Sequence, residues 1–143
     1  MNERERAVAP CGIDCYLCEM YGSNMTEQMK SHAAMLLKID VDKVAPCKGC
    51  RDQHGCLIHS QCDTLDCITA KNHTFCYECS DFPCNCLHPA ADRAERLPHN
   101  LKVYNLCRIK NIGLRQWIEE ESAHSRSLYY KGKIIIGSGP HLE

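Results

Sequence analysis

The sequence predicts an α+β protein, mostly helical, with an irregular cysteine-rich N-terminal half and a small strand or hairpin near the C-terminus. Three observations predict this class. Nine of the thirteen cysteines lie between Cys47 and Cys86, helical patterns flank them on both sides, and Ile134–Ile136 is a short β-prone run. Apolar side chains are scarce among the cysteines, whereas ordering each residue costs about 1–2 kcal/mol. Metal ions or disulfides must therefore hold this half together.

Chain length and net charge limit the domain organisation and the classes of partner. The 143 residues fit a single domain, 1–143, with a cysteine-rich metal-binding part at 11–86, a helical part at 87–124 and a short strand and tail at 125–143. A net charge of −1 gives no general attraction to nucleic acid or to an anionic membrane. The charged start lacks the apolar stretch of a signal peptide, so we expect none, and no run reaches the ~20 apolar residues of a membrane span. We expect a cytoplasmic protein with no membrane partner, for which nucleic acid ranks last among the partner classes.

The cysteine pattern favours metal ions over disulfides. Thiols stay reduced in the cytoplasm, the cysteine count of thirteen is odd, and the cysteines form close groups. Cys47 and Cys50, and likewise Cys76 and Cys79, form Cys-x-x-Cys pairs that can present two thiolates to one ion from a single turn. Upstream, CGIDCYLC (11–18) places three thiols close together. This spacing suits three ligands of one centre.

Helical patterns account for much of the remaining chain. We expect helices at 23–38, 64–71, 98–113 and 114–121, and a charged helical run at 89–97. The first of them carries a methionine-rich apolar face, which we interpret as core. The helix at 98–113 is expected to end at Gly113. Trp117 is expected to anchor the core, and Cys107 to be a buried core thiol rather than a ligand.

Two metal cofactors fit the cysteines. Zinc takes four nitrogen or sulfur ligands in a tetrahedron, and the Cys-x-x-Cys pairs supply such thiolates. A [4Fe–4S] cluster also takes four thiolates, for which the three N-terminal cysteines and a remote Pro-Cys are a suitable set. The residues inside the two pairs, Lys48-Gly49 and Tyr77-Glu78, resemble zinc knuckles slightly more. We therefore favour Zn²⁺, as two or more ions, and keep a [4Fe–4S] cluster as the alternative.

The combination of CGIDCYLC, CKGC, CDTLDC and CYECSDFPC, followed by a helix ending in IKNIGLRQWIEEE, resembles the bacterial and archaeal family called domain of unknown function 3795. The resemblance extends over residues 9–122, and the family has no assigned biochemical activity. It implies ten recurring cysteines as metal ligands: Cys11, Cys15, Cys18, Cys47, Cys50, Cys62, Cys67, Cys76, Cys79 and Cys84. Cys56, Cys86 and Cys107 fall outside this pattern, and neither they nor the histidines are assigned as ligands.

Ten thiols exceed the needs of one tetrahedral site, so they must divide into groups. One compact hypothesis joins the CKGC pair to Cys62 and Cys67. The other six thiols would then bring the N-terminal motif against the CYEC pair. Six thiols exceed one tetrahedral site, so either two sites share them or some stay free; in this hypothesis the metal closes long loops and acts as the core of the N-terminal half.

Three classes of function remain open at this point. The first is a structural-zinc binding or adaptor module, with partner surfaces on the helical C-terminal half and on the Ile134–Ile136 strand. The second is an iron–sulfur protein that acts as a redox or electron-transfer component. The third is an enzyme or metal-handling protein that uses Asp14, Glu78 or a histidine at an open coordination position. No Ser–His–Asp set, paired carboxylates or phosphate loop stands out, so no catalytic residue is assigned and we favour a role other than catalysis.

Overall fold

The computed structural model describes residues 1–57, 61–88, 100–134, 137 and 140–142. In these ranges the α-helices are α1 (Glu3–Arg6), α2 (Glu27–Leu37), α3 (Cys50–Gln53), α4 (Asp63–Ala70), α5 (Leu101–Ile112), α6 (Leu114–Glu120) and α7 (Ser122–Lys131). Short 3₁₀ turns are η1 (Cys15–Leu17), η2 (Gly22–Asn24), η3 (Val41–Lys43), η4 (Cys76–Glu78) and η5 (Asn85–Leu87). Two two-residue strands, β1 (Lys133–Ile134) and β2 (Pro140–His141), follow α7.

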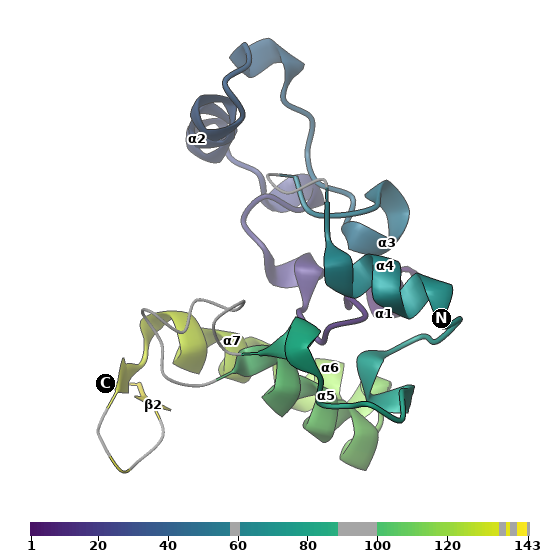
Figure 1. Ribbon diagram of the computed structural model, residues 1–143. Helices are drawn as coiled ribbons and strands as arrows, with labels where there is room; N and C mark the ends of the chain where they lie inside the picture. Colours follow the sequence, from purple (N-terminus) through teal and green to yellow (C-terminus); the bar gives the residue numbers. More distant parts are fainter. Residues whose placement is uncertain (58–60, 89–99, 135–136, 138–139, 143) are drawn as a thin grey trace.

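The main core lies where the C-terminal helices meet the cysteine-rich half. Helices α5, α6 and α7 pack against one another at the base of the molecule (Figure 1). Trp117 of α6 is fully buried beside Leu106 and Ile109 of α5, as expected for a core anchor. Val8 of the N-terminal segment and Leu65 of α4 belong to the same cluster. The two halves of the chain therefore share one hydrophobic core.

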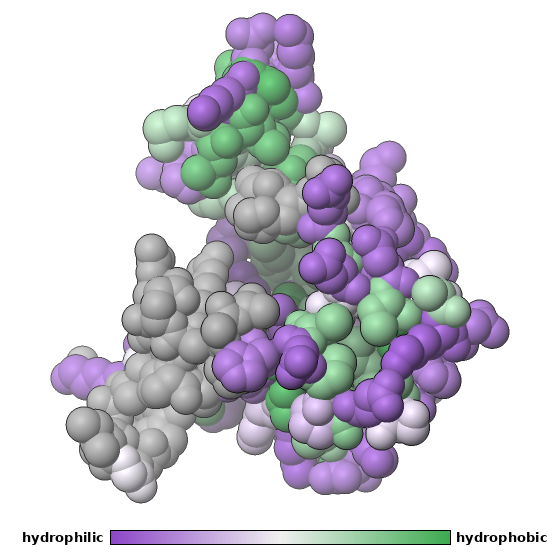
Figure 2. Space-filling model, in the orientation of Figure 1, coloured by the Kyte–Doolittle hydropathy of each residue, from purple (hydrophilic) through white to green (hydrophobic). Residues whose placement is uncertain are grey.

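Helix α2 belongs to a separate lobe at the opposite end of the molecule from α5–α7 (Figure 1). Ala33 and Ala34 on its inner face form a second, small cluster with Val44. Its outer face is apolar but open, since Met35 is 67% and Leu36 49% exposed. Figure 2 shows this apolar surface over the lobe. The predicted methionine-rich face is therefore only partly core.

The predicted α+β class is wrong, because the described chain is mostly helical and contains no sheet layer. Strand pairing in the described ranges is limited to a ladder between β1 and β2, two residues on each side, and to two isolated bridges. A pair of two-residue strands is too short to count as a sheet, so the expected C-terminal strand or hairpin adds no sheet to the helical fold of the described residues. Ile135 and Ile136 of the expected strand lie outside the described residues.

Most of the predicted helices are present with shifted ends. The expected helices at 64–71, 98–113 and 114–121 correspond to α4, α5 and α6, whereas the helical run expected at 89–97 lies outside the described residues. No apolar periodicity anticipates α7, because its buried residues include Ser122 and Ser125. None of the described helices has the length and apolar character needed to cross a membrane.

The prediction that Cys107 is a buried core thiol is wrong. Cys107 is exposed. The buried residues of α5 are Leu101, Asn105, Leu106 and Ile109. Because successive residues of a helix are separated by about 100°, Cys107 points away from the face that carries Leu101, Asn105 and Ile109.

Candidate metal centres

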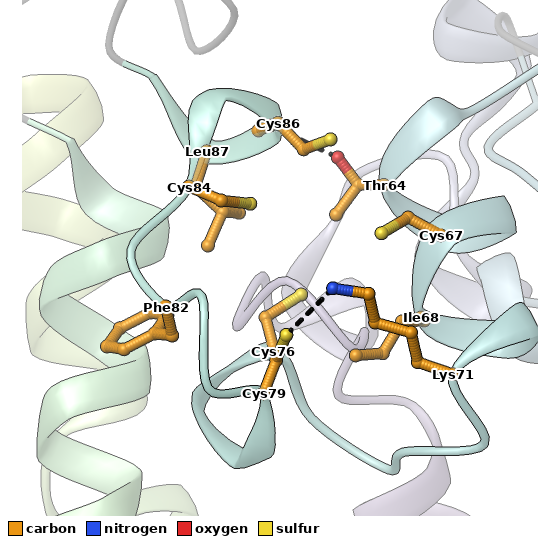
Figure 3. Close-up of a pocket in the computed structure, with 10 residues that line it drawn as sticks. All are labelled: Thr64, Cys67, Ile68, Lys71, Cys76, Cys79, Phe82, Cys84, Cys86 and Leu87. Atoms are coloured by element: carbon orange, nitrogen blue, oxygen red, sulfur yellow. Dashed lines mark hydrogen bonds between the residues drawn. The ribbon is translucent and has the colours of Figure 1, made fainter.

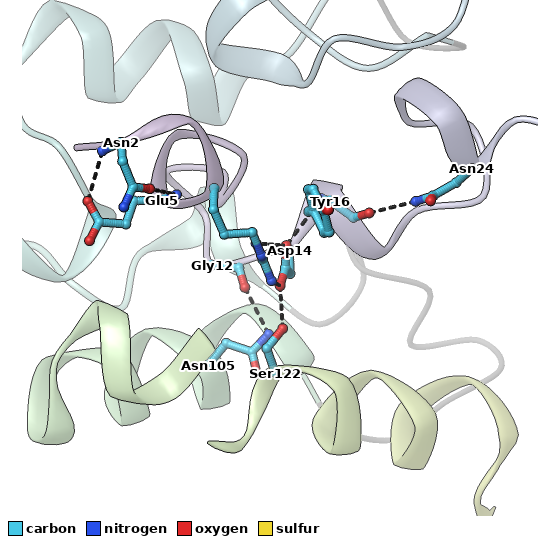
Figure 4. A network of polar contacts seen from close by, with 9 residues as sticks. Asn2, Glu5, Gly12, Asp14, Tyr16, Asn24, Asn105 and Ser122 are labelled. Atoms are coloured by element: carbon cyan, nitrogen blue, oxygen red, sulfur yellow. Dashed lines mark hydrogen bonds and ion pairs between the residues drawn. The ribbon is translucent and has the colours of Figure 1, made fainter. Parts of the chain in front are cut away.

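A buried carboxylate clamps the CGIDC motif onto the C-terminal helices (Figure 4). Asp14, which is 5% exposed, accepts hydrogen bonds from the Arg4 guanidinium at 2.8 and 2.5 Å and from the Ser122 hydroxyl at the start of α7. It also accepts a hydrogen bond from the Tyr16 backbone N–H at 3.1 Å and so caps η1. These donors engage the carboxylate, so Asp14 is a structural residue rather than a group at an open metal position.

Gly12 brings the same motif into direct contact with α5. Its carbonyl accepts a hydrogen bond from Asn105 Nδ2 at 2.8 Å. A Cβ at Gly12 would lie 3.0 Å from Leu106 Cγ and 3.0 Å from the Lys102 carbonyl oxygen. The φ of +86° also favours glycine. The N-terminal cysteine motif is therefore seated on the helical half by a contact that leaves no room for a side chain.

The two Cys-Tyr-x-Cys segments adopt the same backbone shape. Cys15 and Cys18 bracket η1, and Cys76 and Cys79 bracket η4; in each, the N–H of the second cysteine donates to the carbonyl of the first, at 2.9 and 3.2 Å. The second cysteines have φ/ψ of −74°/138° and −75°/138°. Such a tight turn can present both sulfurs of a pair to one ion.

The Cys15–Cys18 turn lies beside the Cys47–Cys50 pair. The Cys47 N–H donates to the Met20 carbonyl at 2.8 Å, and its carbonyl accepts from the Gly22 N–H at 2.9 Å. Cys15 is close enough to Cys50 for the two side chains to interact, and Cys47 is close enough to both members of the turn to interact with their charges. These four residues form the first thiol group: Cys15, Cys18, Cys47 and Cys50.

Backbone N–H groups are directed at the sulfurs of the first thiol group. The Gly49 N–H donates to Cys47 Sγ at 3.4 Å. Cys15 Sγ accepts from the Cys50 backbone, and Cys18 Sγ accepts from the backbone two residues later. N–H groups so placed stabilise bound thiolates and orient them. Burial nevertheless raises the pKa of Cys18 and Cys47, so a bound cation is needed for these two sulfurs to be thiolates near neutral pH.

A second set of cysteines lines a small pocket between α4, η4 and η5 (Figure 3). Its volume is about 20 Å³, enough for one water-sized particle or a single ion. Ile68, Phe82 and Leu87 form the apolar part of its wall. Five of the lining residues are cysteines and form the second thiol group: Cys67, Cys76, Cys79, Cys84 and Cys86.

The sulfurs of the second thiol group come from three separate elements. In Figure 3, Cys67 on α4 and Cys84 ahead of η5 face each other across the pocket, beside the turn that carries Cys76 and Cys79. Cys76 interacts with the charges of Cys67, Cys84 and Cys86, and burial raises its pKa to about 12. The arrangement can supply four thiolates to one ion once a cation displaces the protons.

Lys71, directly after α4, places a cation at the edge of this pocket. Its Nζ donates to Cys79 Sγ at 3.1 Å and to the Asp81 carboxylate at 2.7 Å. The Lys71 side chain is 38% exposed and that of Asp81 66%, so this edge borders solvent. No motif or spacing singles out Lys71 in the sequence, because the contact depends on how α4 packs beside η4.

Cys86 belongs to the second thiol group although it lies outside the family pattern. Its thiol is close enough to those of Cys67 and Cys84 to interact with their charges. The Thr64 hydroxyl of α4 donates to the Cys86 carbonyl at 3.2 Å and holds this segment against the helix. The Cys-x-Cys spacing of 84–86 was the available signal, since both ends of so short a segment stay close in space.

Two of the ten predicted ligands, Cys11 and Cys62, fall in neither group. Both are half-buried and pack against the main core. Cys11 is close enough to Cys15, Cys62 and Cys76 to interact with their charges, and burial raises its pKa to about 11. It therefore lies between the two thiol groups. Cys56 is exposed.

The described candidates for extra ligands, His54 and Glu78, are engaged elsewhere, and His59 lies outside the described residues. His54 pairs with Asp66 at 2.9 Å. Glu78 accepts a hydrogen bond from the Thr74 N–H at 2.8 Å and lies 3.9 Å from His73. Within the part of the chain that the structure describes, no three His, Cys, Asp or Glu side chains form a ready-made metal site. Four thiols of either group must therefore draw together to reach one ion.

The hypothesis that joins Cys47 and Cys50 to Cys62 and Cys67 is wrong. The structure places the CKGC pair against the Cys15–Cys18 turn, while Cys67 lies with the CYEC pair in the second thiol group. Spacing along the chain could not decide this, because the partner of each turn is set by the packing of distant segments.

The fold and the two thiol groups define a small, mostly helical, cysteine-rich protein. A family model described as "Protein of unknown function (DUF3795)" matches residues 7–89, which is more than half of the 143 residues, and the chain belongs to this family. All ten cysteines implied by the resemblance lie within the matched residues. A search of curated proteins and a search of solved structures each found no match.

Proposed function

We propose that this chain is a metal-binding protein in which Zn²⁺ holds the cysteine-rich half together as a structural module. The observation that carries the proposal is the convergence of two Cys-x-x-Cys pairs, Cys15–Cys18 and Cys47–Cys50, from distant parts of the sequence. Four thiolates are a common ligand set for structural zinc. The N–H groups directed at these sulfurs support the same assignment.

Zinc would supply stability that the apolar content of this half cannot. The buried members of the α2 lobe cluster are only Ala33, Ala34 and Val44. Structural zinc contributes about 10–16 kcal/mol in small peptides, more than the typical net stability of about 5–15 kcal/mol for a whole domain. An ion at the first thiol group would join the segment that leads into α2 to the segment that leaves the lobe.

We place a second zinc ion at the second thiol group, which would give two ions per chain. Cys67, Cys76, Cys79 and Cys84 are members of the ligand set that the family resemblance implies, and they meet at one pocket. In this proposal the protein acts as a binding or adaptor module. The ions act as its core, and the helical surface around them is available to a protein partner.

A [4Fe–4S] cluster at the second thiol group is the alternative. Such clusters need four thiolates, and their reduction potentials depend on hydrogen bonds to sulfur and on burial. The Lys71 ammonium on Cys79 and the apolar wall of the pocket favour this reading. The protein would then be a redox or electron-transfer component.

Metal analysis of protein purified without oxygen, together with a UV–visible spectrum, tests the proposal. We expect about two zinc ions per chain, one for each four-thiolate site, and no visible absorption. Iron with acid-labile sulfide and absorption near ~400 nm, as expected of a thiolate-bound cluster, would contradict zinc and support the cluster. Protein that is folded but contains neither metal would contradict both forms.

A matched pair of variants links the ions to their ligands. Cys47→Ser removes the buried thiol of the first thiol group and should abolish binding of one zinc ion. Cys107→Ser changes an exposed cysteine outside both groups and should leave the zinc content unchanged. Equal zinc contents in the two variants would contradict the assignment of Cys47 as a ligand.

A further inference from the structure

A second cavity lies beside α4, on a different face of this helix from the second thiol group. Thr64, Cys67 and Lys71 line the thiol pocket, whereas Leu65 and Thr69 line the other cavity. Further parts of its wall come from α1 and α3, which gather beside α4 in Figure 1. Its volume is about 200 Å³, compared with ~150 Å³ for an apolar cavity that binds benzene. The cavity is therefore large enough for a small organic ligand.

The wall of this cavity is basic. Its titratable side chains are Arg6, Arg51 and His73, and no Asp or Glu of the described chain lines it. Arg6 and Arg51 are close enough to interact with each other's charges, and like charges in one cavity repel each other. Arg6 pairs with Asp52, and His73 lies 3.9 Å from Glu78, but Arg51 has no carboxylate partner among the residues that the structure describes. A bound anion would balance these charges.

Arg51 is held at the wall of the cavity with part of its donor capacity unused. Its Nε donates to the Val8 carbonyl at 2.9 Å, and its Nη2 donates to the Thr74 carbonyl at 2.8 Å. The guanidinium also lies over the ring of Phe75, 5.0 Å from the ring centroid. Because an arginine has five N–H donors in a planar fork, both N–H groups of Nη1 remain beyond the contacts made within the described chain. A guanidinium fixed in this way can bind an oxyanion with little further loss of side-chain freedom.

We propose that this cavity binds a small phosphate monoester, with Arg51 as the anchor of the phosphate group. Arg6, the Thr69 hydroxyl and His73 line the same cavity and supply further donors from separate segments. A phosphate presents three strong acceptor oxygens, whereas a carboxylate presents two, so donors on several sides of the cavity suit the phosphate better.

The apolar part of the wall would take the organic group of the ester. Pro10, Leu65 and Ile68 line the cavity and are buried. Arg6 and Thr69 are exposed, so the cavity is open to solvent on their side and a ligand can enter without unfolding. No cysteine of the described chain lines the cavity. The inference therefore adds a ligand to the proposed metal-binding module and does not depend on which metal the thiols bind.

Titration calorimetry on the full chain, purified without oxygen, tests this inference with three probes: phenyl phosphate, inorganic phosphate and benzoate. Phenyl phosphate should bind about tenfold more tightly than inorganic phosphate, because its ring removes apolar surface of the wall from water. It should also bind about tenfold more tightly than benzoate, which offers fewer charged acceptors to the arginines. Equal affinities for the three probes would indicate a general attraction of anions and overturn the inference, as would the absence of binding.

A matched pair of arginine variants locates the binding. Arg6→Gln changes an exposed residue of the cavity wall and should weaken the binding of phenyl phosphate by about tenfold. Arg115→Gln is the control, since Arg115 is exposed and pairs with Glu5 at 3.5 Å outside the cavity; it should leave the affinity unchanged. Equal affinities of the two variants would overturn the inference.

Arg51→Met should abolish the binding of phenyl phosphate, because it removes the anchor. Arg51 also holds the Val8 and Thr74 carbonyls, so circular dichroism and metal content are measured to show whether this variant is folded. Binding that persists in the folded variant would overturn the inference. If the variant does not fold, the comparison of Arg6→Gln with Arg115→Gln decides alone. Metal content tests the proposed function separately, so the two proposals can fail independently.

Discussion

The two thiol groups are built on the same turn but sit in different surroundings. The Cys-Tyr-x-Cys turns at Cys15–Cys18 and Cys76–Cys79 have nearly identical backbones. The first is clamped to α5 and α7 through Gly12 and Asp14. The second opens on a pocket with a solvent-exposed lysine at its edge and a fifth thiol. The local motif therefore supplies the ligands, whereas the packing around it decides how firmly an ion can be held.

Removal of the metal should have the largest effect and should act on both groups. We expect a strong chelator to unfold residues 11–86 while α5 and α6 keep part of their helicity, since the lost metal contributes about 10–16 kcal/mol. Circular dichroism measures the loss of helix from the whole chain, and the fluorescence of the buried Trp117 shows whether the helical half stays packed. Unchanged circular dichroism after verified metal loss would show that neither group is structural.

Asp14→Asn should weaken the first thiol group and leave the second intact. The change removes a buried charge that faces Arg4 and Ser122, and breaking such a pair from one side costs about 3 kcal/mol. Denaturant unfolding of the metal-loaded protein measures the loss. Asp40→Asn is the control, because the Asp40–Lys43 pair is 76% and 71% exposed and should change stability by about 0–1 kcal/mol.

Gly12→Ala should loosen the same group through its backbone. The added Cβ would meet Leu106 and the Lys102 carbonyl at 3.0 Å, at a φ of +86°, and such strain costs about 2 kcal/mol. Gly22→Ala is a matched control, since Gly22 has a φ of +47° with nothing within 4 Å of its added Cβ; it should lose about 1 kcal/mol. Equal losses of unfolding free energy in the two variants would contradict the close contact with α5.

Lys71→Met should have the smallest effect and should change only the second group. A four-thiolate divalent site carries a net negative charge, which the Lys71 ammonium at 3.1 Å from Cys79 Sγ offsets. We expect the affinity for one of the two ions to fall by about tenfold, measured by competition with a chelator of known affinity. Lys71→Arg should retain most of the affinity. Lys48→Met changes an exposed lysine between Cys47 and Cys50 of the first thiol group and should leave the affinity for the second ion unaffected. An equal fall for both ions would remove the distinction between the groups.

Local features of the fold were predictable from the sequence. Helices α5 and α6 meet at Gly113, and Trp117 is fully buried, as expected from apolar spacing and a glycine stop. The Cys-x-x-Cys pairs were recognised because their chemistry lies within four consecutive residues. Helix α7 was not anticipated, because its buried face carries serines whose surroundings, including Asp14, come from distant parts of the chain.

The sequence by itself determined the supply of thiols, the family and the main helices, since each depends on residues near one another in the chain. Tertiary structure alone decided which cysteines meet. Cys47 lies with the Cys15–Cys18 turn because the segments around Met20 and Gly22 pair with it, and Cys86 reaches the pocket because Thr64 holds its segment. Tertiary packing also leaves Cys107 exposed, because the segments packed against α5 cover the face that carries Leu101, Asn105 and Ile109. Contacts between distant segments depend on the whole packed chain, and no local pattern of cysteines encodes them.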